Sequence, residues 1–310
     1  MVRLIALGLL AAAFFSSTFV LNRAMSLEGG HWVWTGALRY GWMIVLLSAW
    51  LAASQGLASL LAVWKTFRAH WQFWCIAGTI GFGLFYAPLC LAASYAPSWV
   101  IASTWQTTIL ATPIVLLFFG QKVPMRGVRL TGLIFAGILL VNFEQADFSN
   151  WRQLVLGIVP VLLAAIVSPL GNELVKSAMN GGYQRVPSIT GSAIQNAPSR
   201  ILLMTLGSVP FWLVLILVTQ PGAPEPGHYL NTALVALLSG VIGTSIFFQV
   251  RHNTKNSYET AAVDATQAGE TVFALVGEVA LLSGAWPGLP SWVGLGLIIG
   301  GLALYTKKNA

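Results

Sequence analysis

Three acidic residues lie in one apolar stretch near the end of the chain. Asp264, Glu270 and Glu278 fall within residues 259–282, which otherwise have the composition of a membrane helix. A charge at mid-bilayer costs about 2.5–3.5 kcal/mol even on the gentler insertion scale, so each carboxyl needs a physical reason to be there. At 100° per residue, Glu270 points well away from the other two, so one helix face cannot serve all three. Glu270 lies at the centre of the stretch.

Glu270 is the main candidate for proton coupling. Because burial disfavours a carboxylate anion, this side chain can be protonated near neutral pH and can exchange its proton for a cationic substrate. The alternative is structural: a satisfied polar residue that caps a neighbouring broken helix. Intramembrane acids usually mark ion or substrate pathways, which favours the first interpretation.

Arg39 is a basic residue inside an apolar stretch, about seven residues, or roughly 10 Å, from the outer end of residues 32–53. Three interpretations remain open. Arg39 could pair with Glu278 at comparable depth, bind a substrate carboxylate, or extend toward the outer interface. A free arginine favours anionic or zwitterionic metabolites, whereas a neutralised one leaves the cavity to cations.

Other polar and aromatic residues of the apolar stretches are candidate cavity or gate residues. Two glutamines could line a cavity or hydrogen-bond between helices. Ring faces could attract a cation or an aromatic substrate, or could pack as ordinary core. The cavity candidates are Gln106, Gln267, Trp105, Tyr86, Phe82 and Phe247. The gate or structural candidates, for which helix capping is the alternative, are Asn22, Asn172, Glu173, Asp264 and Glu278.

The elements that must position these residues are membrane helices. Apolar residues make up 56% of the 310 residues and charged residues 8%, against roughly 25% charged in a globular domain. This composition excludes a soluble fold and a disordered chain. Two cysteines, Cys75 and Cys90, are too few for a disulfide framework or a four-ligand metal site, and we expect neither a metal nor a cofactor.

Ten stretches are long enough to cross the membrane, which takes about 20 mostly apolar residues. They cover residues 4–22, 32–53, 71–93, 98–119, 127–143, 153–175, 201–219, 230–250, 259–282 and 291–306. No gap between them could hold a soluble domain. We therefore expect an all-α integral membrane protein with ten transmembrane helices.

The basic residues orient these helices. With the amino terminus inside, only Arg23 and Arg152 fall in outside loops. Thirteen bases fall on the inside: Arg3, Lys65, Arg68, Lys122, Arg126, Arg129, Lys176, Arg185, Arg200, Arg251, Lys255, Lys307 and Lys308. This positive-inside bias predicts that both termini are cytoplasmic. The net charge of +7 is therefore a topology signal, and we expect no nucleic-acid partner.

The ten helices divide into two weakly similar halves. STWQTTILA (103–111) aligns with DATQAGETV (264–272), which matches Gln106 to Gln267. GTIGFGLFY (78–86) aligns with SGVIGTSIF (239–247) after a shift of one residue. Since five is odd, the second copy must enter the membrane in the opposite sense. We expect two inverted five-helix repeats, residues 1–148 and 149–310. Inverted repeats of this kind build transporters with a midplane site.

Proline and glycine predict local features of these helices. Prolines free backbone carbonyls and predict interruptions in the helices that contain Pro88, Pro113, Pro160, Pro169 and Pro210. Such breaks are tolerable where a helix lines a cavity. Gly296 and Gly300, four residues apart, predict close helix approach within the chain or to a second copy.

The sequence resembles the ten-helix, EamA-like members of the drug/metabolite transporter superfamily, through its two halves and the glycine-rich TGLIFAG (131–137) and VGLGLIIGG (293–301). SSTFVLNRAM (16–25), GGHW (29–32), LRYGWM (38–43), GFGLFYAPLCLAASYAPSWV (81–100), TWQ (104–106) and LGSVPFWLVL (206–215) resemble its "putative multidrug resistance efflux transporter" branch. The resemblance covers nearly the whole chain and implies a ten-helix inner-membrane exporter. The fourth and ninth spans of that superfamily often end with Gly-Glu. At these positions this chain has Gly120-Gln121 and Ser283-Gly284 instead.

A secondary transporter explains the repeat, the breaks and the buried carboxyl together. An enzyme is not expected, because all four histidines lie at span ends or loops and neither H-E-x-x-H nor G-x-S-x-G occurs. A channel or receptor would not need inverted halves. We expect export of cationic or amphipathic small molecules by proton antiport; the alternative is export of amino acids or related metabolites by antiport or facilitated diffusion. The expected partners are the substrate, protons and the lipid bilayer, with the protein a monomer or homodimer.

Overall fold

The computed structural model describes residues 2–120, 125–146, 149–254, 259, 263–264 and 266–309, and within these residues it is all-helical, without a β-strand. The first half contains α1 (Val2–Leu27), α2 (Trp32–Gln55), α3 (Leu57–Ala69), α4 (Trp71–Gly78), the π-helical segment η1 (Thr79–Leu84), α5 (Phe85–Ala92), α6 (Ser98–Trp105), α7 (Thr108–Phe118) and α8 (Met125–Gln145). The second half contains α9 (Trp151–Met179), α10 (Ser192–Gln195), α11 (Ala197–Thr219), α12 (Pro226–Val235), the π-helical segment η2 (Ala236–Gly243), α13 (Thr244–His252), the 3₁₀ turn η3 (Thr266–Ala268), α15 (Gly269–Leu282) and α16 (Leu289–Asn309).

Among these residues, seven helices or runs of helices are long and apolar enough to cross a membrane. They are Val2–Leu27, Trp32–Gln55, Trp71–Ala92, Ser98–Phe118, Trp151–Met179, Ala197–Thr219 and Pro226–Phe247. Gly132–Gln145 and Leu289–Leu304 are shorter apolar helices at the expected fifth and tenth positions. The expected ninth span, residues 259–282, lies partly outside the described residues. Ten spans therefore remain a prediction, whereas a multi-pass membrane protein is confirmed.

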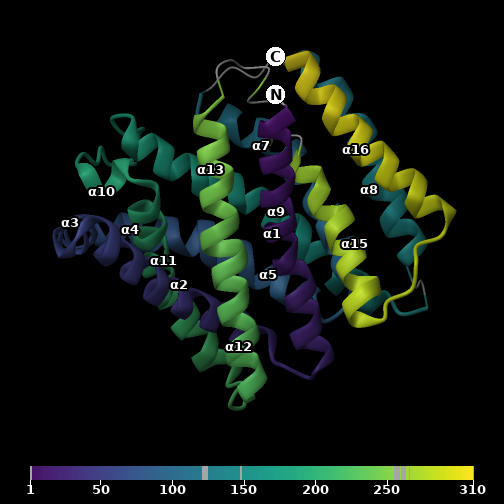
Figure 1. Cartoon of the computed structure of the whole chain (residues 1–310), viewed down its shortest axis with the longest axis horizontal. Helices are drawn as coiled ribbons and strands as arrows, with labels where there is room; N and C mark the ends of the chain where they lie inside the picture. The colour runs from purple at the N-terminus through teal and green to yellow at the C-terminus, as the bar shows by residue number, and fades with distance from the viewer. Residues whose placement is uncertain are drawn as a thin grey trace.

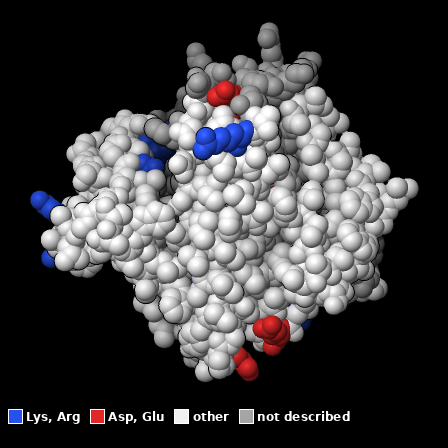
Figure 2. Space-filling view, viewed as in Figure 1, with Lys and Arg blue, Asp and Glu red and all other residues white. Residues whose placement is uncertain are grey.

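The outer surface of the bundle is apolar. Large side chains such as Leu117, Phe118, Leu217 and Val218 are more than half exposed, as expected for helices that face lipid. In Figure 2 most of the visible face carries no charge, and the charged side chains gather at its edges. The beginning of α1 and the end of α16 lie at the same end of the molecule (Figure 1).

The helices of the third and eighth positions both change geometry at mid-length. A π-helical segment joins α4 to α5, and a second joins α12 to α13. π-Helical segments are rare and are frequent at functional sites. The helix of the fourth position is also broken, because α6 ends at Trp105 and α7 begins at Thr108.

The prolines do not break their helices where the sequence predicts. Pro160 and Pro169 lie inside the continuous α9, and Pro210 lies inside α11, so the interruptions expected there are wrong. Pro88 lies inside α5, and η1 ends four residues earlier at Leu84. A proline removes the donor for the carbonyl four residues before it, which explains why the irregular segment precedes Pro88.

Close packing between α8 and α16 depends on glycines other than the two that the sequence indicates. A Cβ atom on Gly137 would lie 2.5 Å from the carbonyl oxygen of Gly294, and one on Gly294 would lie 2.7 Å from that of Gly137. Gly296 and Gly300 have no such neighbour within 4 Å. α8 and α16 consequently lie side by side along their lengths, and the Gly296–Gly300 face does not mediate that contact.

Candidate substrate and coupling site

Arg39 lies two turns into α2 and is 8% exposed. Its guanidinium carbon lies 4.0 Å from the centre of the Tyr86 ring, and its Nη2 donates to the Ser239 hydroxyl at 3.4 Å. Its Nε makes no hydrogen bond, and neither ion pair found among the described residues includes Arg39. A ring face and one hydroxyl therefore surround this cation, and no described carboxylate neutralises it.

Tyr86 is fixed on its other side by Asn22. The Tyr86 hydroxyl donates to Asn22 Oδ1 at 2.9 Å, and Asn22 Nδ2 lies 3.8 Å from Cys90 Sγ. All three side chains are buried. Asn22, a gate or capping candidate by sequence, thus lies inside the bundle, where it positions the ring that contacts Arg39.

Aromatic rings continue from this point toward α11. The Tyr40 ring stacks on Phe82 at 5.2 Å and on Trp212 at 5.5 Å, and it meets Tyr86 edge-on at 5.7 Å between centroids. Such pairs contribute about 0.5–1.5 kcal/mol each beyond their buried area. We use the name Arg39 cluster for the group of Asn22, Arg39, Tyr40, Tyr86 and Ser239.

The two π-helical segments flank the Arg39 cluster. η1 carries Phe82 and leads directly into the turn of α5 that holds Tyr86, while η2 carries Ser239. Each segment contains two glycines, Gly81 and Gly83 in η1 and Gly240 and Gly243 in η2, and glycine tolerates irregular backbone. Helices from both halves of the chain therefore meet at Arg39.

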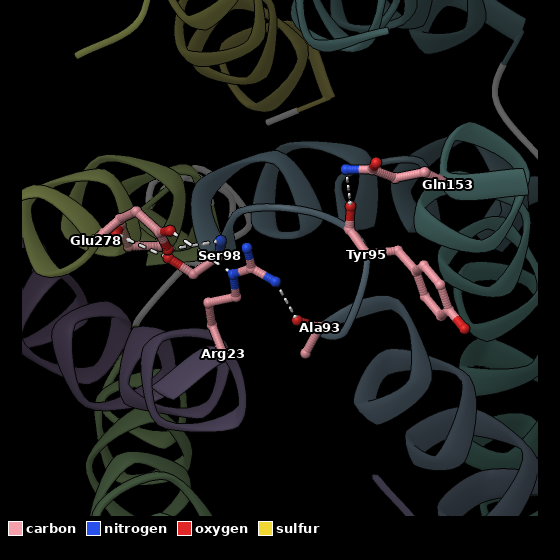
Figure 3. A network of polar contacts seen from close by, with 7 residues as sticks. Arg23, Ala93, Tyr95, Ser98, Gln153 and Glu278 are labelled. Carbon is pink, nitrogen blue, oxygen red and sulfur yellow. Dashed lines mark hydrogen bonds and ion pairs between the residues drawn. The ribbon is translucent and has the colours of Figure 1, made fainter. Parts of the chain in front are cut away.

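Glu278 does not pair with Arg39, so that interpretation of the sequence is wrong. Its carboxylate accepts from the backbone N–H of Ser98 at 2.8 Å and lies 3.9 Å from Arg23 Nε. Arg23 also donates from Nη1 to the Ala93 carbonyl at 2.8 Å, as Figure 3 shows. We call Arg23, Ala93, Ser98 and Glu278 the Arg23 network. It connects α1, the α5–α6 connection and α15, because the carboxylate caps the first turn of α6.

Glu270 is 6% exposed and lies in the first turn of α15, directly after the 3₁₀ turn. It forms neither a hydrogen bond nor an ion pair with any side chain that the structure describes. The structural alternative, in which Glu270 caps a neighbouring helix, has no described hydrogen bond to support it. The side chain is a buried carboxyl without a described partner.

The two glutamines occupy similar backbone positions. Gln106 follows the last residue of α6 at the α6–α7 break, is 2% exposed, and reaches only the Ala102 carbonyl, at 3.4 Å. Gln267 lies in the 3₁₀ turn that precedes α15 and is half-buried. Trp105 packs against Phe85 at 5.1 Å, beside Tyr86. Both glutamines thus lie at irregular points of their helices.

Two other candidates lie away from the Arg39 cluster. Phe247 meets Phe15 edge-on at 6.0 Å, in a separate apolar cluster with Ala11 and Val250. Asp264 is half-buried beside segments that lie outside the described residues. The structure does not bring Phe247 together with Phe82 and Tyr86.

Asn172 and Glu173 line a cavity of about 150 Å³ between α7 and α9, together with Thr108 and Thr112. Glu173 is buried and pairs with the exposed Lys176 at 3.4 Å. Glu173 lies twenty residues beyond Gln153 along α9, which is about 30 Å at 1.5 Å per residue. Gln153 hydrogen-bonds the Tyr95 carbonyl in the α5–α6 connection, close to the Arg23 network (Figure 3). The cavity and the Arg23 network therefore lie toward opposite ends of α9.

His31 begins α2 from the loop that precedes it. Its Nδ1 accepts from the Val33 N–H at 3.3 Å, which requires a neutral ring, and burial lowers the pKa of His31. The His228 ring lies nearby and shares a hydrogen bond with Thr35 at 3.0 Å. These contacts fix the amino-terminal end of α2, the helix that carries Arg39.

The sequence alone did not single out Arg23, Ser239 or Trp212. Arg23 follows Asn22 directly, and its position at a span end assigns it to an outside loop rather than to an ion pair. Ser239 and Trp212 are single polar and aromatic residues in apolar stretches, with no signal that separates them from ordinary packing. Their roles depend on which faces of α1, α11 and η2 turn inward.

Comparison with known proteins identifies a family and relatives that match most of this chain. Residues 2–310 match the family EmrE, described as "Putative multidrug resistance efflux transporter". The uncharacterized protein YjlA of Bacillus subtilis (strain 168) is 36% identical over 97% of this chain and 94% of its own length. An uncharacterized 42.1 kDa protein of Shouchella clausii is 33% identical over 85% of this chain and 69% of its own. A solved crystal structure with 15% identity shares the fold, with a TM-score of 0.62 over 100% of this chain and 98% of the other.

The all-helical fold and the apolar spans define a multi-pass membrane protein of a transporter family rather than of an enzyme family. The chain belongs to the EmrE family of "putative multidrug resistance efflux transporters".

Proposed function

We propose that the protein is a secondary active transporter of the cell (inner) membrane that exports small molecules in exchange for protons, with both termini cytoplasmic. The observation that carries the proposal is Glu270, a buried carboxyl with no hydrogen bond or ion pair to any described residue. Such a group is costly in a membrane protein and marks a proton or substrate pathway in most cases.

Two inverted five-helix repeats, residues 1–148 and 149–310, provide the architecture of this proposal. The matched third and eighth helices both contain a π-helical segment, and the matched Gln106 and Gln267 both lie at irregular turns. Shared irregularities at matched positions support a common origin for the halves. In such transporters the two halves rock around a midplane site.

Access to that site would alternate between the two ends of the bundle. The Arg23 network holds one end together, while the cavity beside Asn172 and Glu173 lies toward the other. We propose that breaking the Arg23 network opens the outer end. Protonation of Glu270 from outside would then release the substrate, and deprotonation inside would let the next one bind.

Two substrate classes are consistent with this scheme. The family description and an acidic Glu270 favour cationic or amphipathic drugs. The uncompensated Arg39 favours the alternative, amino acids or related metabolites. Neither class needs a bound cofactor.

The test uses the purified full chain in proteoliposomes that contain a pH-sensitive dye. Addition of a mixed panel of organic cations and amino acids should release protons with at least one substrate. Glu270→Gln should insert and fold but lose this release, because an amide cannot carry the proton. Glu28→Gln, the same change at an exposed loop position, serves as the control. The absence of proton release with every substrate, or an unchanged pH dependence in Glu270→Gln, would rule out the proposal.

A further inference from the structure

Arg39 is a buried cation whose counter-charge is missing among the described residues. At 8% exposure the side chain does not extend to the interface. Its expected partner, Glu278, is occupied by Arg23 and the Ser98 N–H. A buried charge without a partner strongly destabilises a fold, so a permanently uncompensated guanidinium is a costly feature.

The donors of Arg39 are not all used. A guanidinium offers five N–H donors in a planar fork; here Nη2 donates to the Ser239 hydroxyl at 3.4 Å, the Tyr86 hydroxyl is a second partner, and Nε has no partner among the described residues. A planar fork of this kind matches a carboxylate, which accepts two parallel N–H bonds. The neighbouring hydroxyls of Ser239 and Tyr86 are neutral. The single positive charge of Arg39 therefore matches a ligand with a single negative charge.

The surroundings fit an organic rather than an inorganic anion. The ring centres of Tyr86 and Tyr40 lie 4.0 and 5.8 Å from the guanidinium carbon, and Phe82 stacks on Tyr40 at 5.2 Å, so the immediate surroundings of this cation are aromatic. The helices on both sides of Arg39 contain π-helical segments, where a local change of geometry could admit a ligand.

We propose that Arg39 anchors a binding site for small organic carboxylates, anionic or zwitterionic, with an apolar body that lies against Tyr40 and Tyr86. The inference rests on the proposed transport function and names its substrate class. The carboxylate accepts from the guanidinium of Arg39, and the Ser239 hydroxyl orients that guanidinium. The Arg39 cluster offers no negatively charged group that could pair with a cation lacking a carboxylate.

The primary experiment compares three probes that share one apolar body: 4-phenylbutanoate, 4-phenylbutanamide and 4-phenylbutylammonium. Binding to the wild-type chain in detergent is measured by isothermal titration and by the shift of the unfolding temperature. The carboxylate should bind roughly tenfold more tightly than the amide or the ammonium, the discrimination expected for a charge-assisted hydrogen bond. Equal or tighter binding of the ammonium would overturn the proposal.

Variants locate the binding. Arg39→Gln should abolish the preference for the carboxylate, and Arg39→Lys should retain part of it, because lysine keeps the charge but not the fork. Monodisperse elution with wild-type helicity shows that each variant is folded. Should Arg39→Gln fail to fold, Ser239→Ala provides a second readout, with severalfold weaker carboxylate binding and unchanged amide binding. A folded Arg39→Gln variant that still prefers the carboxylate as the wild type does would contradict the proposal. So would a Ser239→Ala variant that binds the carboxylate with wild-type affinity.

Failure of this inference is distinguishable from failure of the proposed transport function. Glu270→Gln should still bind 4-phenylbutanoate. If the wild type exchanges cations for protons but discriminates against the carboxylate, the inference is wrong and proton coupling stands. If the carboxylate binds through Arg39 but no substrate releases protons, the carboxylate site stands and proton coupling is wrong.

Discussion

Arg39 and Glu270 are both buried charged residues in apolar helices, and the sequence identifies both from their type and depth alone. What touches them could not be predicted in the same way. Depth along a helix follows from counting residues, and it made Glu278 a reasonable partner for Arg39. The rotation of each helix decides the actual contact, and it brings Arg23 to Glu278 and Tyr86 to Arg39. Rotation depends on packing between helices, which a single sequence does not record.

His31 gives a pH-dependent contribution to stability. Burial lowers the pKa of His31 in the folded chain, so the unfolded chain binds the proton more tightly and stability falls as the pH drops below about 6.5. His31→Asn should keep the helix cap, since asparagine is a good acceptor at this position. Between pH 7.5 and pH 5.5 the unfolding temperature of this variant should fall less than that of the wild type.

His70→Asn is the matched control, because His70 also precedes a helix but makes no capping hydrogen bond through its side chain. Its pH profile should follow the wild type. An identical loss of unfolding temperature in His31→Asn and in the wild type would contradict a role for His31. The measurement is thermal unfolding in detergent at the two pH values.

At the scale of helices, hydropathy located most elements correctly and missed their irregularities. The seven long spans match seven of the predicted stretches, because length and apolar content suffice for that purpose. α3 was not expected, and it carries exposed Leu57, Leu61 and Trp64 on a short amphipathic helix. The π-helical segments were also missed, since no proline lies within them and their backbone departs only slightly from an α-helix.

Gly207 permits the close approach of α11 to α4. A Cβ atom at this position would collide with the backbone carbonyl of Trp74, which cannot move aside as a flexible side chain could. Gly207→Ala should therefore separate the two helices and lower the unfolding temperature by several degrees, as overpacking costs about 1–3 kcal/mol. Gly222→Ala, where no atom lies within 4 Å, should leave it unchanged. A wild-type unfolding temperature for Gly207→Ala would show that the packing adapts.

At the scale of the whole molecule, the Arg23 network is the feature most directly connected with the alternating access proposed above. It joins three separate helices at one end, and Cys90 lies buried one turn of α5 before Ala93. In a Cys75→Ala background, Cys90 is therefore a native reporter of opening at that end.

Glu278→Gln should weaken the Arg23 network and expose Cys90. The rate at which a membrane-impermeant maleimide labels Cys90 should rise at least about tenfold, since the loss of a charged hydrogen-bond acceptor costs about 1.5–3 kcal/mol. Glu225→Gln, at an exposed position, should label at the parent rate. Parent-rate labelling of Glu278→Gln would show that other contacts close this end.

The pairing of α8 with α16 also has a consequence for how the chain is made. Gly137 and Gly294 fit against each other's backbone, and Glu144 accepts from the N–H of Ser291 at 2.6 Å, yet these partners lie about 150 residues apart in sequence. At roughly 5–20 residues per second, α8 waits on the order of 10–30 s after its own synthesis before its partner leaves the ribosome. During that interval the face of α8 that holds Gly137 lacks its partner. A chain that stops before residue 289 would leave Gly137 without the backbone of α16 to pack against.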